Sequence, residues 1–211
     1  MMNQTEKTGA FRVATDGKSG AAILIGHLLL LLFELAVVIH AFAGEGLATL
    51  RFYTTDSNLL CGVASALFLL QRGKPDTMVR LLRFIATSCL LVTFTVVLLV
   101  LGPQNGYAHE FLGGTRFFSH LLCPFLSLAL FLTGEERAPQ RWVGYALFTT
   151  LLYAIPMIIL NGMGLVSGPY SFLKIREQSL ASTLFWIVVI LGGNALLALA
   201  AVLLQKRFFK R

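Results

Sequence analysis

Most of the chain is arranged in long apolar blocks, and this pattern restricts its fold more than any other feature of the sequence. The six blocks cover approximately residues 20–42, 50–70, 79–101, 115–133, 142–162 and 180–204. A helix of about 20 apolar residues is long enough to cross the roughly 30 Å hydrocarbon layer of a bilayer. The sequence therefore predicts an all-α, polytopic membrane protein with six transmembrane helices.

The composition supports this fold class and excludes a disordered chain. Of the 211 residues, 56% are hydrophobic and only 13% are charged, which is unusual for a soluble domain. Residues 1–19 form a polar tail and residues 205–211 a basic tail, and no soluble domain or internal repeat is visible between them. We therefore expect one six-helix domain spanning residues 1–211.

The basic residues indicate how the helices are oriented. Of the 17 Lys and Arg residues, most lie in the two tails or in the connections at residues 71–83 and 134–141. The exceptions are Arg51, Arg116, Lys174 and Arg176. Because cytoplasmic loops carry the excess of positive charge, both termini are predicted to be cytoplasmic. The net charge of +7 then reflects topology, and no nucleic-acid partner is expected.

The second predicted helix carries a row of polar residues that lipid would not tolerate. Thr54, Ser57, Asn58, Cys61 and Ser65 follow one another at helical spacing and therefore share one face. A polar face within a bilayer must contact other protein or a cavity. Any functional site is therefore expected against this face.

The fourth predicted helix brings a histidine to a similar depth. Both helices enter the membrane from the outer side, so Thr54 and His120 are each expected in its outer half. A histidine inside a membrane-spanning helix is costly and is often functional. Pro124 follows four residues later and removes the hydrogen bond that the His120 carbonyl would otherwise accept. Other interior polar residues are expected to be Glu34, Tyr153 and Asn161.

Several alternative chemistries lack the residues that they need. The histidines have no metal-ligand spacing, so neither a metal nor a cofactor is expected. The Gly-x-Ser-Gly pattern of a rhomboid-type protease occurs only at residues 17–20, where the polar tail meets the first apolar block, and no glycine-rich phosphate loop occurs. All three cysteines lie in predicted helices without a C-x-x-C pair, which argues against a disulfide framework. Transport stays open as an alternative, although the two halves show no evident inverted repeat.

Four segments of the chain resemble a known family of small six-span bacterial membrane proteins. Residues 52–60, FYTTDSNLL, resemble its aromatic-x-Thr-x-x-Ser-Asn-Leu-Leu segment, and residues 120–125, HLLCPF, resemble the His-x-x-x-Pro of its fourth helix. Residues 168–173, GPYSFL, resemble its Tyr-Pro-x-Pro-Phe-Leu loop, and residues 194–196, NAL, its last helix. These bacterial proteins are similar to the eukaryotic androgen-induced-gene/ADTRP proteins, which are intramembrane threonine hydrolases.

The resemblance implies a hydrolase of fatty acid esters of hydroxy fatty acids that uses a threonine and a histidine. Carried across, the threonine falls on Thr54, with Thr55 as a one-residue alternative, and the histidine on His120. Phe117 stands where many relatives have the first histidine of a His-x-x-His pair, and Leu130 stands where relatives have an acidic residue. These departures affect any relay through those groups and leave the Thr/His pair in place.

The resulting hypothesis is a lipid-ester hydrolase in which His120 takes the proton of Thr54 and the threonine oxygen attacks the ester. Ser57 or Asn58 is expected to donate to the oxyanion, and Glu34 or Asp56 to orient the histidine. Residues expected to contact substrate are Arg116, Tyr153, Asn161 and Tyr170. The partner would be a membrane lipid or fatty-acid ester, in a bacterial plasma membrane.

A non-catalytic lipid-binding or small-molecule transport protein is the alternative. The enzyme and the transport protein require differently shaped cavities. A dead-end cavity beside Thr54 favours an enzyme, whereas a continuous path between the two membrane faces favours transport.

Overall fold

The computed structural model describes residues 18–134 and 137–208, and within these ranges every regular element is a helix. The predicted all-α class is therefore confirmed. The longest elements are α1 (Lys18–Glu45), α2 (Tyr53–Leu70), α3 (Thr77–Val96), α6 (Cys123–Gly134), α7 (Trp142–Gly162) and α8 (Leu180–Phe208). Most of the predicted N-terminal tail and the last three residues of the basic tail lie outside the described residues.

Short helical segments occupy the connections. They are η1 (Gly46–Arg51), η2 (Val97–Leu101), α4 (Gly102–Asn105), α5 (Tyr107–Leu112), η3 (Phe118–Leu122), η4 (Ser171–Leu173) and η5 (Ile175–Glu177). The stretch between the third and fourth predicted spans is thus two short helices and not an open loop. Pro103 suits the first turn of α4, and Gly106, at φ 94°, separates α4 from α5.

Four helices of the described chain are long and apolar enough to cross a membrane. They cover Gly20–Arg51, Thr77–Asn105, Trp142–Gly162 and Leu180–Phe208. The other two predicted spans also form helices, but α2 has 18 residues and begins with a polar turn, and the apolar stretch Phe118–Thr133 is shorter still. The four long helices are compatible with an integral membrane protein.

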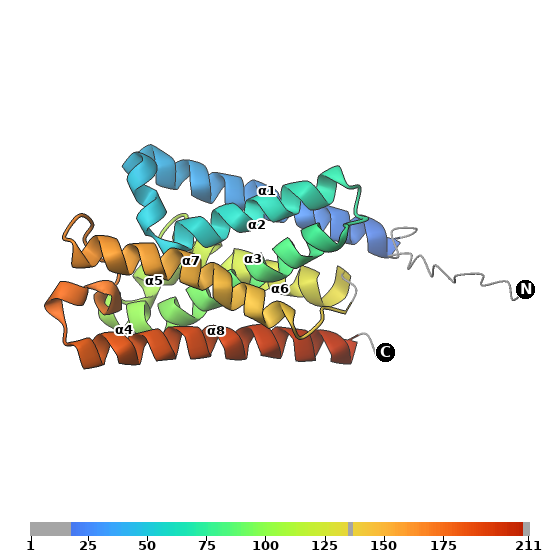
Figure 1. The fold of residues 1–211 in the computed structure, drawn as a ribbon. Coiled ribbons are helices and arrows are strands. Elements are labelled where there is room, and N and C mark those ends of the chain that lie inside the picture. Colours follow the sequence, from blue (N-terminus) through green and yellow to red (C-terminus); the bar gives the residue numbers. More distant parts are fainter. Residues whose placement is uncertain (1–17, 135–136, 209–211) are drawn as a thin grey trace, which may run out of the picture.

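Helix α3 is the centre of the bundle. It packs against α2, α6, α7 and α8, while α1 packs on α2 and α6. In Figure 1, α1 and α2 run along one side of the bundle, and α8 runs along the opposite side. The start of α1 and the end of α8 lie at the same end of the bundle (Figure 1).

Burial follows this arrangement. In the apolar stretch of α3, 61% of the residues are buried, compared with 28% in α1, 17% in α7 and 22% in α8. Large apolar side chains such as Ile39, Phe148 and Val188 therefore point away from the protein. Such surfaces suit lipid tails, which are as apolar as the side chains themselves.

Interhelical hydrogen bonds complement apolar packing inside the bundle. The side chain of Asn194 in α8 donates to the Thr150 hydroxyl of α7 at 2.7 Å. The Gln205 amide, fully buried near the end of α8, donates to the Phe131 carbonyl and accepts from the Ala138 N–H. Polar side chains commonly join helices in this way in an apolar environment, and here they tie α8 to α7 and α6.

Candidate functional site

The start of α2 is fixed to α7 by the hydroxyls of two tyrosines, Tyr53 of α2 itself and Tyr153 of α7. The Tyr53 hydroxyl lies 2.8 Å from the Thr150 hydroxyl of α7, and the Tyr153 hydroxyl donates to the Arg51 carbonyl at 2.6 Å. The preceding residue, Phe52, has an extended backbone, so α2 begins abruptly at this point. Thr54 therefore occupies a fixed position in the first turn of α2.

Tyr170 is the polar neighbour of Thr54. The Thr54 N–H donates to the Tyr170 hydroxyl at 3.3 Å, and the two hydroxyl oxygens are 3.5 Å apart. Tyr170 comes from the connection between α7 and α8, and its ring stacks on Phe172. Burial raises the pKa of the Tyr170 phenol, so the hydroxyl keeps its proton and can donate it to the Thr54 oxygen.

Thr54 lies in the wall of an apolar cavity of about 160 Å³. The cavity is bounded by α3, α7, α8, the start of α2 and the connection that carries η4 and η5. Its walls include Val92, Val96, Ile158, Leu173, Trp186 and Ile190. Thr54, Tyr153 and Tyr170 bring polar groups into this lining. Apolar walls with a few polar groups are typical of a small-molecule site.

The proposed oxyanion donors are engaged with the backbone of α2. Ser57 donates to the Thr54 carbonyl at 3.0 Å, and the amide of Asn58 donates to the same carbonyl at 2.7 Å. The Ser57 hydroxyl also lies 3.0 Å from that of Thr93 on α3. In this arrangement Ser57 and Asn58 hold the first turn of α2, and neither side chain lines the cavity.

His120 is buried in η3, where the helix widens before Pro124. Its Nδ1 lies 2.8 Å from the Glu110 carbonyl oxygen and 3.7 Å from the Glu110 carboxylate. The Nδ1–H therefore donates to that carbonyl, which leaves the Nε2 lone pair available. Across the described residues no hydrogen bond joins His120 to Thr54.

Glu110 is the residue at the site that the sequence reasoning missed. It lies in α5, outside the predicted spans, yet it is only 5% exposed. Asn105 donates to its carboxylate at 2.8 Å. The sequence offered one signal for this contact, a carboxylate ten residues before the histidine of the fourth predicted span. That spacing alone does not show that the connection carrying Glu110 folds back onto the helix carrying His120.

Glu34 and Asp56, the two carboxylates expected to orient the histidine, lie elsewhere. Glu34 in α1 is buried beside the thiols of Cys61 and Cys123. Asp56 is half-buried in the first turn of α2. Neither makes a hydrogen bond or ion pair with His120 within the part of the chain that the structure describes. Glu34 instead belongs to a second polar cluster between α1, α2 and α6.

The expected substrate-contacting residues divide into two groups. Tyr153 and Tyr170 line the cavity. Arg116 is exposed at the start of the fourth predicted span and does not line it. Asn161 is buried and holds the connection after α7, because it donates to the Val166 carbonyl and accepts from the Ile175 N–H.

Among the described residues, no group of three or more His, Cys, Asp and Glu side chains has an arrangement that could hold a metal ion. No protein-family model, curated protein or solved structure matches the chain.

Proposed function

We propose that this protein binds a membrane lipid ester in the apolar cavity and hydrolyses it with Thr54 as the nucleophile. The observation that carries the proposal is the position of the Thr54 hydroxyl, which lies in the wall of a largely apolar cavity beside the Tyr170 hydroxyl. A hydrocarbon chain in the cavity would bring its ester carbonyl close to both oxygens.

In the proposed reaction, the Thr54 oxygen attacks the ester carbonyl and its proton passes to His120 Nε2. The tetrahedral intermediate collapses, the alcohol leaves with that proton, and an acyl-threonine remains. Water then attacks the acyl-threonine as His120 takes its proton, and the fatty acid is released while His120 returns that proton to the Thr54 oxygen. Because Tyr170 keeps its proton, its hydroxyl is a suitable donor to the developing oxyanion.

The Glu110 carboxylate would stabilise the imidazolium that forms when His120 takes the proton. It lies 3.7 Å from Nδ1 and is itself held by Asn105. His120 does not line the cavity, so the proposed reaction requires its Nε2 to move to the Thr54 hydroxyl when substrate binds. The proposed substrate class, fatty acid esters of hydroxy fatty acids, rests on the resemblance of residues 52–60 and 120–125 to the androgen-induced-gene/ADTRP family.

A non-catalytic lipid-binding protein is the second candidate. It is favoured by one observation, namely that His120 bonds Glu110 and makes no hydrogen bond to Thr54 within the described residues. The same cavity would then hold a lipid without cleaving it.

Labelling with a fluorophosphonate probe separates the two candidates. If Thr54 is an activated nucleophile, we expect the probe to modify the purified protein, and mass spectrometry of the digest to place the adduct on Thr54. The Thr54→Ala protein should not be labelled. A folded wild-type protein that binds a lipid but takes no label would favour the binding protein.

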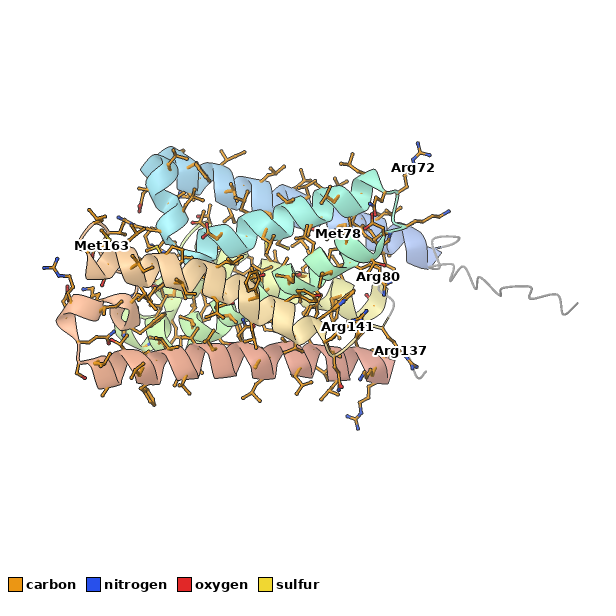
Figure 2. All side chains as sticks on the ribbon, viewed as in Figure 1. Arg72, Met78, Arg80, Arg137, Arg141 and Met163 are labelled. Carbon is orange, nitrogen blue, oxygen red and sulfur yellow. The ribbon has the colours of Figure 1, made fainter. Side chains whose placement is uncertain are left out.

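We further propose six membrane crossings with both termini in the cytoplasm of a bacterium. Arg72, Arg80, Arg137 and Arg141 lie toward the end of the bundle where α8 ends, and Met163 lies toward the opposite end (Figure 2). An excess of positive charge on one side supports a cytoplasmic location for that end. Placing the start of α1 and the end of α8 together also fits an even number of crossings.

Cysteine accessibility tests this topology. In a variant without native cysteines, a cysteine at position 167, in the connection between α7 and α8, should react with a membrane-impermeant maleimide added to intact cells. A cysteine at position 137 should react only after the membrane is opened. The reverse labelling pattern would mean that the protein has the opposite orientation, with the Thr54 cavity in the inner half of the membrane.

A further inference from the structure

A second hollow lies between α3 and α8, next to the cavity beside Thr54. Its volume is about 310 Å³, and we call it the α3/α8 groove. Leu99, Phe185, Val189, Gly193 and Leu197 belong to its mostly apolar lining. Leu99 and Phe185 are 67% and 60% exposed, so the groove lies at a surface that faces the bilayer in the proposed topology.

The groove and the cavity share one wall. Val92 and Val96 of α3 and Trp186 and Ile190 of α8 line both hollows. These four side chains are apolar or aromatic, so no buried charge separates the two spaces. The two hollows are therefore adjacent, with these four side chains between them.

Size explains why a second hollow matters for a lipid. A dry cavity of about 150 Å³ holds one benzene ring, so the cavity beside Thr54 has room for about six carbon atoms of a chain. On the same scale the groove has room for about twelve more. A long acyl chain whose ester lies at Thr54 must therefore continue beyond the cavity, and the groove is the adjoining apolar space.

We propose that the α3/α8 groove is a second subsite, which takes the distal part of a long, unbranched acyl chain whose ester end lies at Thr54. This inference rests on the proposed lipid-ester function. It adds a substrate preference, for long-chain over short-chain esters. It also implies that the acyl chain passes beside Trp186 on its way from the cavity to the groove. Groove-lining residues of α8 then determine the chain length that the protein accepts.

Two adjacent glycines of α8 provide a matched pair of variants. Gly193 lines the groove, and a Cβ added there would meet no atom within 4 Å. Gly192 is exposed, lines neither hollow, and has equally open space around it. Gly193→Phe should therefore fill the groove, while Gly192→Phe makes the same chemical change on the outside of the helix.

Hydrolysis of p-nitrophenyl palmitate and p-nitrophenyl hexanoate measures chain selectivity. We expect Gly193→Phe to lower kcat/KM for the palmitate ester by about tenfold or more, because several methylenes lose their site, and to leave the hexanoate ester nearly unchanged. Gly192→Phe should match the wild type with both esters. Gly193→Leu fills less of the groove and replaces Gly193→Phe if the larger side chain prevents folding.

A binding measurement keeps this test independent of catalysis. A stearic acid brominated at mid-chain should quench the fluorescence of Trp186 in the Thr54→Ala protein. Gly193→Phe should weaken that quenching, Gly192→Phe should keep it, and Trp186→Phe should abolish it, which separates the signal from Trp142. If the quenching pattern is as expected but the wild-type protein hydrolyses neither p-nitrophenyl ester, the groove is supported and the proposed enzyme is contradicted. If Gly193→Phe binds and hydrolyses long chains like the wild type, the groove is not a chain subsite.

Discussion

Replacing Thr54 with alanine is expected to reduce lipid-ester hydrolysis by about a thousandfold or more, because the reaction loses its nucleophile. His120→Ala should have a comparable effect on kcat. The double variant should be hardly worse than either single variant, since residues that act as one unit lose activity non-additively. The measurement is kcat and KM with a lipid ester in detergent, alongside the melting temperature of each variant.

Thr55 supplies the control for this prediction. It is adjacent in sequence, but its hydroxyl is buried and lies 3.0 Å from that of Thr49, away from the cavity lining. Thr55→Ala should therefore keep most of the activity, with some loss of stability from the broken hydrogen bond. A folded Thr54→Ala protein that still hydrolysed the ester, with Thr55→Ala inactive, would reverse the assignment of the nucleophile.

Glu110→Gln should have the second large effect, a fall in kcat of about a hundredfold with little change in KM. The carboxylate lies 3.7 Å from His120 Nδ1, in a mostly buried position where opposite charges attract by several kcal/mol. Removing that charge leaves the imidazolium formed during catalysis less stable. Steady-state kinetics across a range of ester concentrations separates kcat from KM.

Asn105→Ala is the matched comparison for Glu110. It removes the hydrogen bond to the Glu110 carboxylate and keeps the charge beside His120. A loss of activity much smaller than that of Glu110→Gln is expected. Equal losses in the two variants, together with lower melting temperatures, would mean that the contact only stabilises the connection between α3 and η3.

The helical class and the approximate limits of the six apolar stretches could be predicted from sequence, because long apolar blocks have few alternative structures. Helical spacing also placed Thr54 on a polar face, but of that face only Thr54 lines the cavity. The cavity itself could not be predicted. Its walls come from α3, α7, α8 and Tyr170, and their approach depends on packing between residues distant in sequence.

The partners of the buried ionisable groups were harder to predict than the groups themselves. From their depth in the membrane, Glu34 and His120 were expected to meet, but depth does not determine which way a helix faces. In the structure Glu34 lies beside Cys61 and Cys123, while His120 contacts Glu110. The fold of the connection at 102–114, with Gly106 between two short helices, decides that second contact.

The central position of α3 has a consequence for how the chain is made. Domains and spans emerge from the ribosome in order, so α3 enters the bilayer before α6, α7 and α8 exist. The partner of its Thr93 hydroxyl, Ser57 of α2, is already made at that stage, whereas the partner of its Thr87 hydroxyl, Ser127 of α6, is not. In a nascent chain that stops after α3, the helix whose span is the most buried of the four long ones in the finished bundle therefore still faces lipid.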